Sequence, residues 1–216
     1  MKTREASAPK AAKPRGRPRS FDREAALAAA IEVFWRKGFE GTSISDLTQA
    51  MGINPPSLYA AFGDKEQLFL EAADSYSRSR GDECPYCDEG TARGAIEKLL
   101  TYMARELTEG DHPRGCMMVM AAATSANASS RLQKAIAEKR IASRDHLRAR
   151  IKRGIEEGDV PADTDAGALA DFYSTIISGL STQARDGATR RSLLATVERS
   201  MQLFPVAPAS NRKRAA

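Results

Sequence analysis

The 216-residue chain is long enough for one or two domains, and its 42% hydrophobic and 28% charged residues are ordinary for a soluble protein. The sequence has no run of 18 apolar residues, so no transmembrane helix is expected, and the basic N-terminus lacks the apolar segment of a secretory signal. Three cysteines do not make a disulfide framework and fit a reducing cytoplasm, so we expect a cytoplasmic protein without membrane contact.

Residues 1–20 are rich in Ala, Pro, Lys and Arg without hydrophobic periodicity, so we expect a disordered basic arm. Residues 205–216 are expected to be a disordered basic tail. Of the net charge of +5, the arm carries +6 and this tail carries +3, which leaves −4 for the rest. The arm contains P-R-G-R-P-R, which resembles the AT-hook core, and Arg15 and Arg17 would enter the minor groove of A·T-rich DNA. The alternative is a solvated basic tail, but the DNA-binding motif that follows in the sequence favours a minor-groove contact by the arm.

The first predicted helix covers residues 22–37, with Asp22 as its N-cap and Gly38 after its end. Leu27, Ile31 and Phe34 give it one apolar stripe. Trp35 is interpreted as a packing residue.

The sequence of residues 42–69 predicts two short helices joined by a tight turn, followed by the start of a third helix. Ser43 and Asp46 form a capping box for the first of them, and Gly52 ends it. Asn54 caps the second, and Pro55 occupies its first position, where the missing N–H costs nothing. This arrangement is typical of the DNA-binding helix-turn-helix, whose second helix enters the major groove.

The alternative is an ordinary helical hairpin, and two details favour DNA. Leu58 and Phe62 already supply the core face of the second helix, so its remaining surface is small and uncharged. Lys65 follows at the start of the third helix, within reach of a phosphate. The candidate DNA-binding residues are Arg15, Arg17, Thr42, Ser43, Pro55, Pro56, Ser57, Tyr59 and Lys65.

The same stretch resembles the signature of the TetR family of transcriptional repressors over about residues 21–70. The matching segments are Thr42-Ser43, Ala50-Met51-Gly52-Ile53-Asn54, Leu58-Tyr59-Ala60-Ala61-Phe62 and Lys65-Glu66-Gln67-Leu68. Family members often carry an aromatic residue and a histidine where this chain has Ala60 and Ala61, so those contacts do not carry over. The resemblance implies an all-α fold and a homodimer that binds palindromic operator DNA and is released by a small molecule.

The predicted organisation follows from this resemblance and from the helical pattern. A helix-turn-helix domain with its connecting helix covers residues 21–80, and a regulatory and dimerisation domain covers residues 81–204. Within the second domain, residues 81–90 are expected to be a loop. Further helices are predicted over residues 91–108, 115–124, 129–157, 163–186 and 189–204; the second of these is apolar all round and is expected to be buried.

The last two helices carry a wide apolar face. On the first of them it comprises Leu169, Phe172, Tyr173, Ile176, Ile177 and Leu180, with small residues such as Gly179 beside it. The face can be plain intramolecular core, but a single helix-turn-helix reads few bases, which favours a two-fold dimer through these helices.

A small-molecule pocket is predicted in the same domain. Its candidate lining residues are Tyr102, Met103, Cys116, Met117, Met120, Phe172, Tyr173 and Ile176. Methionine suits adaptable apolar cavities, and few charges fall on these faces, so an uncharged or weakly polar effector is expected.

Cys84-Pro-Tyr-Cys87 leaves a different switch open. These two cysteines with Cys116 would make a redox- or metal-responsive repressor, whereas the bland interpretation is an ordinary loop. No cofactor is expected. With His112 and His146 as its only histidines, and without a nucleophile set or phosphate loop, the chain is not expected to be an enzyme.

Overall fold

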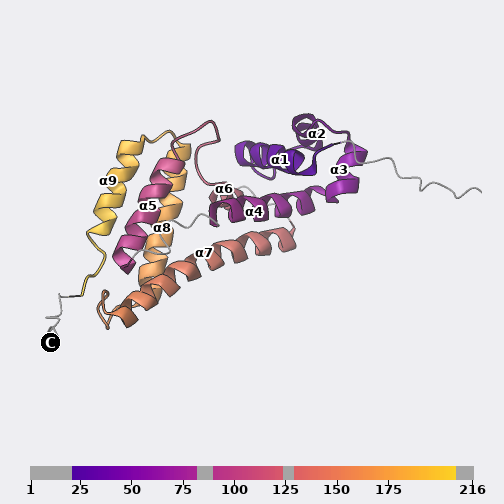
Figure 1. The fold of residues 1–216 in the computed structure, drawn as a ribbon. Helices are drawn as coiled ribbons and strands as arrows, with labels where there is room; N and C mark the ends of the chain where they lie inside the picture. The colour runs from indigo at the N-terminus through magenta and orange to yellow at the C-terminus, as the bar shows by residue number, and fades with distance from the viewer. Residues whose placement is uncertain (1–20, 82–89, 124–128, 208–216) are drawn as a thin grey trace, which may run out of the picture.

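The computed structural model describes residues 21–81, 90–123 and 129–207, and within these ranges the chain forms nine α-helices and no β-strand (Figure 1). The predicted all-α fold is therefore confirmed. In chain order the helices are α1 (Arg23–Lys37), α2 (Ile44–Met51), α3 (Pro55–Phe62), α4 (Lys65–Gly81), α5 (Ala92–Glu106), α6 (Met117–Ala123), α7 (Ser130–Glu157), α8 (Ala166–Arg185) and α9 (Arg190–Met201). None of these described helices has the length and apolarity needed to cross a membrane.

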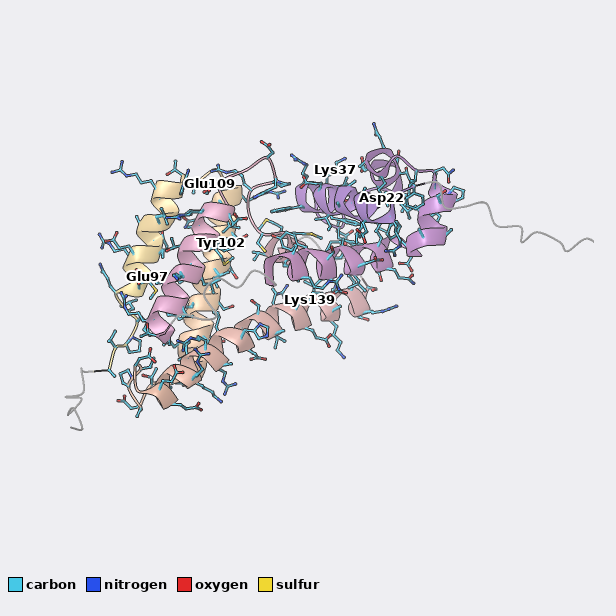
Figure 2. All side chains as sticks on the ribbon, in the orientation of Figure 1. Asp22, Lys37, Glu97, Tyr102, Glu109 and Lys139 are labelled. Carbon is cyan, nitrogen blue, oxygen red and sulfur yellow. The ribbon has the colours of Figure 1, made fainter. Side chains whose placement is uncertain are left out.

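The helices gather in two groups that α7 joins (Figure 1). The group of α1, α2, α3 and α4 lies at one end, and α5, α8 and α9 lie together at the other. α7 runs along both groups, packing against α4 and α6 and against α5 and α8. Lys139 of α7 forms an ion pair with Asp74 of α4, which ties the long helix to the first group (Figure 2).

Buried side chains form two hydrophobic clusters. The first lies among α1, α2, α3 and α4 around Phe34, Leu58 and Phe69, and it also takes in Met117 of α6 and Ile136 of α7. The second lies among α5, α7, α8 and α9 and comprises Ala92, Ile96, Leu100, Ala104, Leu107, Leu147, Ile151, Val160, Ala166, Ala170, Tyr173, Leu180, Ala184, Leu193, Val197, Met201 and Phe204. Because α6 and the beginning of α7 contribute to the first cluster, the N-terminal helices share a core with the part of the chain that follows residue 81.

Local capping sets most helix boundaries. Asp22 accepts hydrogen bonds from the backbone N–H groups of Glu24 and Ala25 at the start of α1, as predicted. α8 begins at Ala166, later than the predicted residue 163, because Asp165 caps it by accepting from two backbone N–H groups. α9 ends at Met201 rather than at residue 204, and Phe204 folds back into the second cluster.

The apolar segment around α6 is less buried than its composition predicts. Met117 and Ala121 are buried, but Met118, Val119 and Met120 are only partly covered. The expectation of burial all round is therefore wrong. The physical reason is that the packing of α6 against α1, α4, α7 and α8 buries Met117 and Ala121 but covers the three residues between them only in part.

Candidate DNA-binding surface

The turn between α2 and α3 is built from local hydrogen bonds. The hydroxyl of Ser43 accepts from the backbone N–H of Asp46 at 3.1 Å, and the Asp46 carboxylate accepts from the backbone N–H of Ser43 at 2.9 Å. Gly52 follows α2 with φ 65° and ψ 28°, the left-handed conformation that glycine adopts without a Cβ penalty. Asn54 then caps α3 by accepting from the backbone N–H of Ser57 at 2.9 Å. The predicted helix-turn-helix caps are all present.

Packing fixes the rotation of α3 about its own axis. Leu58 is fully buried and Phe62 is 5% exposed, and both belong to the first cluster. Arg23 of α1 holds the end of α3, because its guanidinium donates to the carbonyl of Ala61 at 3.2 Å and lies 4.4 Å from the Phe62 ring centroid. The same guanidinium pairs with Glu71 of α4, so one side chain links three helices.

The opposite side of α3 faces solvent. Tyr59 is 51% exposed, and Pro55, Pro56 and Ala60 are exposed beside it, whereas Ser57 is half-buried. These residues form a face without a charged group. It is the surface on which the sequence places its major-groove contacts, and it is available to a partner.

Thr42 does not belong to this surface. Its side chain is 1% exposed, and its hydroxyl donates to the carbonyl of Gly38 at 2.6 Å. Thr42 therefore closes the end of α1 instead of facing DNA, which corrects its place among the candidates. Ser43 is exposed, but its hydroxyl is already engaged with Asp46.

The nearby cations are committed to internal contacts. Lys65 is half-buried with its Nζ 4.4 Å from the Phe39 ring centroid, and this burial lowers the pKa of its ammonium group. Lys37 pairs with Asp46 at 2.6 Å (Figure 2 labels Lys37), and Arg36 pairs with Glu32 at 3.2 Å. A phosphate contact by Lys65 would therefore require its side chain to leave the Phe39 ring. Arg15 and Arg17 lie outside the described residues.

A second set of contacts joins the N-terminal helices to the rest of the molecule. The indole N–H of Trp35 donates to the carbonyl of Gly115 at 2.8 Å, and the Trp35 ring stacks on His112 at 4.8 Å between centroids. Arg185 at the end of α8 donates to the carbonyls of Trp35 at 2.9 Å and Arg36 at 2.7 Å, which caps the C-terminus of α1. Trp35 is thus the packing residue that the sequence indicates.

Arg23 and Arg185 were not identified from the sequence. Both act through contacts to residues far away in the chain, 38 to 48 positions for Arg23 and 149 or 150 for Arg185. No local spacing signals such a partner.

The eight predicted ligand-lining residues do not gather in one cluster. Met117 is part of the first, whereas Tyr173 is fully buried in the second and donates its hydroxyl to the carbonyl of Ser200 at 3.1 Å. Burial raises the pKa of Tyr173 to about 12, so its phenol is neutral. Met103, Phe172 and Ile176 are partly buried against the second cluster, Cys116 packs against both clusters, and Tyr102 and Met120 are half-buried.

A surface depression lies elsewhere, between α5 and α9. Its lining residues are Arg93, Glu97, Thr101, Leu194, Val197, Glu198, Met201 and Gln202, so it contains none of the eight candidates (Figure 2 labels Glu97 and Tyr102 on α5). It is open and bears four charged or amide side chains, unlike the apolar pocket that the sequence predicts.

Cys116 is the only described member of the candidate cysteine switch. It is half-buried, and its backbone N–H donates to the hydroxyl of Ser181 at 2.8 Å. Cys84 and Cys87 lie outside the described residues. In the part of the chain that the structure describes, no three His, Cys, Asp or Glu side chains gather where they would hold a metal ion.

The predicted dimer face on α8 is only partly covered within one chain. Leu169, Phe172, Ile176 and Ile177 are half-buried, and Gly179 is exposed. A Cβ placed on Gly179 would meet no atom within 4 Å. This side of α8 can therefore accept further packing.

Comparisons with known proteins agree with this geometry. Residues 26–72 match the family described as bacterial regulatory proteins, tetR family, and residues 92–199 match the tetracyclin repressor-like C-terminal domain. The HTH-type transcriptional repressor ComR of Escherichia coli strain K12 is 32% identical over 196 residues, which cover 89% of this chain and 93% of ComR. The repressor BdcR of the same strain is 32% identical over 185 residues, which cover 84% of this chain and 88% of BdcR.

A solved structure is similar over most of the chain. It is a cysteine mutant of the TetR family transcriptional regulator CifR, complexed with 26-bp double-strand operator DNA. CifR is 44% identical in sequence, and the TM-score of the two structures is 0.84. Their alignment covers 88% of this chain and 100% of the CifR chain.

Proposed function

The chain belongs to the tetR family of bacterial regulatory proteins, and from this premise we propose that it is a transcriptional repressor that binds operator DNA. The observation that carries the proposal is the orientation of α3: Leu58 and Phe62 face the core, while Tyr59 and its neighbours face solvent. CifR, which is 44% identical, was solved on operator DNA with the same fold. Of the predicted contacts, we retain Arg15, Arg17, Ser43, Pro55, Pro56, Ser57, Tyr59 and Lys65.

The repressor acts as a homodimer on a palindromic operator. A helix of eight residues contacts few base pairs, so two copies are needed to specify a site. The half-buried apolar side chains of α8, with α9 beside them, form the self-complementary surface that a two-fold dimer requires.

A small, uncharged or weakly polar molecule releases the repressor from DNA. Support comes from the partly buried Met103, Phe172 and Ile176 at the margin of the second cluster, where apolar side chains can move apart. No observation on the described residues favours the alternative switch through Cys84, Cys87 and Cys116.

Selection of DNA from a random duplex library by the full-length protein tests operator binding. We expect enrichment of one inverted repeat with half-sites about one helical turn apart. Failure to enrich any duplex, or enrichment of unrelated duplexes, would contradict operator recognition.

Sedimentation of matched variants tests the dimer. Gly179→Arg is accommodated in one chain, because no atom lies within 4 Å of a Cβ at this position, but it would obstruct a second α8. Ala142→Arg places the same side chain on an exposed position of α7 and is the control. We expect dimeric wild type and Ala142→Arg but monomeric, folded Gly179→Arg; a dimeric Gly179→Arg would exclude this side of α8.

A thermal-shift screen with metabolites and metal ions tests the effector. A molecule that binds the native state raises the melting temperature by mass action, by RT ln(1 + [L]/Kd) in free energy. We expect an apolar or weakly polar hit that also dissociates the selected duplex. A hit that stabilises the protein without affecting DNA would not be the effector.

A further inference from the structure

We propose that α3 recognises its half-site mainly by apolar contact with the methyl groups of thymine, through Pro56 and Ala60. The inference rests on the proposed function and deepens it, because it states which chemistry of the operator is recognised. It also predicts what a base substitution does when all hydrogen bonds are left intact.

The exposed face of α3 is one continuous small surface. Pro56 and Ala60 are four residues apart and therefore lie one turn apart on the same side of the helix. Tyr59 and Pro55 flank them, and all four residues are exposed. Leu58 and Phe62 fix the rotation of the helix, so this side cannot turn inward without opening the core.

Hydrogen-bond recognition of bases needs groups that this face lacks. Guanine is recognised by paired donors of Arg or Lys, and adenine by the carbonyl and amide of Asn or Gln acting together. α3 contains none of these residue types. Asn54 precedes it, but its side-chain oxygen accepts from the backbone N–H of Ser57 at 2.9 Å, so it cannot make the bidentate adenine pair.

The neighbouring cations do not replace the missing donors. Arg23 is held by Glu71 and by the carbonyl of Ala61, and Lys37 is paired with Asp46. Lys65 lies over the Phe39 ring. Tyr59 and the half-buried Ser57 each carry one hydroxyl, which can bind a phosphate or a single base atom but cannot by itself distinguish four base pairs.

Apolar contact remains, and the major groove offers one apolar group. The C5-methyl of thymine is the group that Ala and similar side chains recognise there. Small side chains without charge let the helix approach this methyl closely and remove it from water. Burial of one methyl group corresponds to about a fourfold change in affinity.

Deoxyuridine substitution measures this contact directly. Deoxyuridine lacks only the methyl of thymine and keeps its pairing and its O4 acceptor. Each thymine of the duplex selected by the full-length protein is replaced in turn, and the dissociation constant is measured at fixed salt. We expect about a fourfold loss at one or two thymines in each half-site.

Protein variants assign the contact to α3. The loss of affinity caused by deoxyuridine should fall below about twofold in at least one of the variants Ala60→Gly and Pro56→Ala. Ala142→Gly makes the same change on an exposed position of α7 and should keep the full penalty. The scan on the wild type does not depend on the folding of any variant.

Three results would overturn the inference. The first is a duplex whose affinity is unchanged by deoxyuridine at every thymine. An A·T preference that comes from minor-groove contacts would give this result, since the thymine methyl lies in the major groove. The second is a loss confined to 7-deazaguanine substitutions, which would indicate hydrogen bonds to guanine. The third is a penalty unchanged in both α3 variants. Failure to select any duplex would instead contradict operator binding itself.

Discussion

Tyr59 and Leu58 are adjacent in the chain but have opposite surroundings, with Tyr59 51% exposed and Leu58 fully buried. We predict that Tyr59→Phe weakens binding to the selected duplex about two- to tenfold, the value of one net hydrogen bond, without changing the melting temperature. Leu58→Ala is the opposite control and should cost about 2–5 kcal/mol of unfolding free energy. A large loss of stability in Tyr59→Phe with intact DNA binding would mean that the rotation of α3 differs.

Asp46 connects α2 to α1 through the ammonium group of Lys37 at 2.6 Å, in addition to capping α2. The hydrogen bond from Lys37 and those from Ser43 hold the pKa of the Asp46 carboxyl well below its usual range. The unfolded pKa is about 3.9, so the carboxylate contributes its full stability above that pH and loses it as the pH falls towards the lower folded-state pKa.

The prediction concerns the difference in melting temperature between the wild type and Asp46→Asn. It should be constant from pH 8 to about pH 5 and should shrink below about pH 4. Thermal unfolding across this pH range measures it. A difference that changes near neutral pH and stays constant in acid would rule out the depressed pKa as its origin.

At the scale of elements, the segment between α5 and α6 is held between α1 and α8. Gly115 has φ 84°, and a Cβ on it would lie 3.0 Å from the carbonyl oxygen of Ser181. Gly187 has φ 96°, but a Cβ there would meet nothing within 4 Å. Both glycines therefore have a positive φ, but only at Gly115 would a Cβ also come too close to another atom.

We predict that Gly187→Ala costs about 1–2 kcal/mol of unfolding free energy, because an L-residue is strained at positive φ. Gly115→Ala should cost about 1–3 kcal/mol more, since it also forces the segment away from α8 and disturbs the Trp35 contact. Denaturant unfolding of both variants measures the difference. Equal losses would show that the segment yields without resistance.

The helix-turn-helix is the part of the fold that its sequence predicts most completely. Its helix ends are capped by residues that contact partners only three or four positions away in the chain, namely Ser43, Asp46, Gly52 and Asn54. Such short-range capping follows from residue type and spacing. The buried positions of α3 follow from its period. Thr42 departs from the predicted DNA-facing position because its hydroxyl donates to the carbonyl of Gly38, a contact that the spacing does not predict.

Packing between distant elements was not predictable. The composition of α6 indicates burial on every side, but how much of a helix is covered depends on which neighbours reach it. The separation of Met117 and Tyr173 into different clusters likewise depends on the path of α7 and α8. Hydrophobic periodicity assigns residues to a core, but it does not say which core.

At the scale of the whole molecule, charge and proposed function are in tension. Residues 21–80 contain six Lys/Arg and nine Asp/Glu, a net −3, so the DNA-binding helices repel a phosphate backbone unless other residues compensate. The arm carries +6 over residues 1–20. Two or three arm contacts per subunit would contribute about four to five units to the slope of log K against log salt for a dimer.

Deletion of residues 1–19 should therefore flatten that slope by about four to five units and relax any A·T preference beside the half-sites. Folding and dimerisation should persist, because beyond Met1 the arm has no large apolar residue. Operator affinity across a salt series, measured for the full-length and the truncated protein, gives the comparison. An unchanged slope and affinity would show that the arm is a solvated tail.

The central proposal, a dimer that presents two copies of α3 to two half-sites, is tested most directly by scrambling one half of the selected duplex. The dissociation constants of the full-length protein for the intact and the half-scrambled duplex are compared at the same salt concentration. Each mismatched base pair typically costs about 1–3 kcal/mol, so several mismatches in one half-site should weaken binding at least about a hundredfold. A loss of less than about twofold would contradict the account, because one copy of α3 would then suffice for recognition.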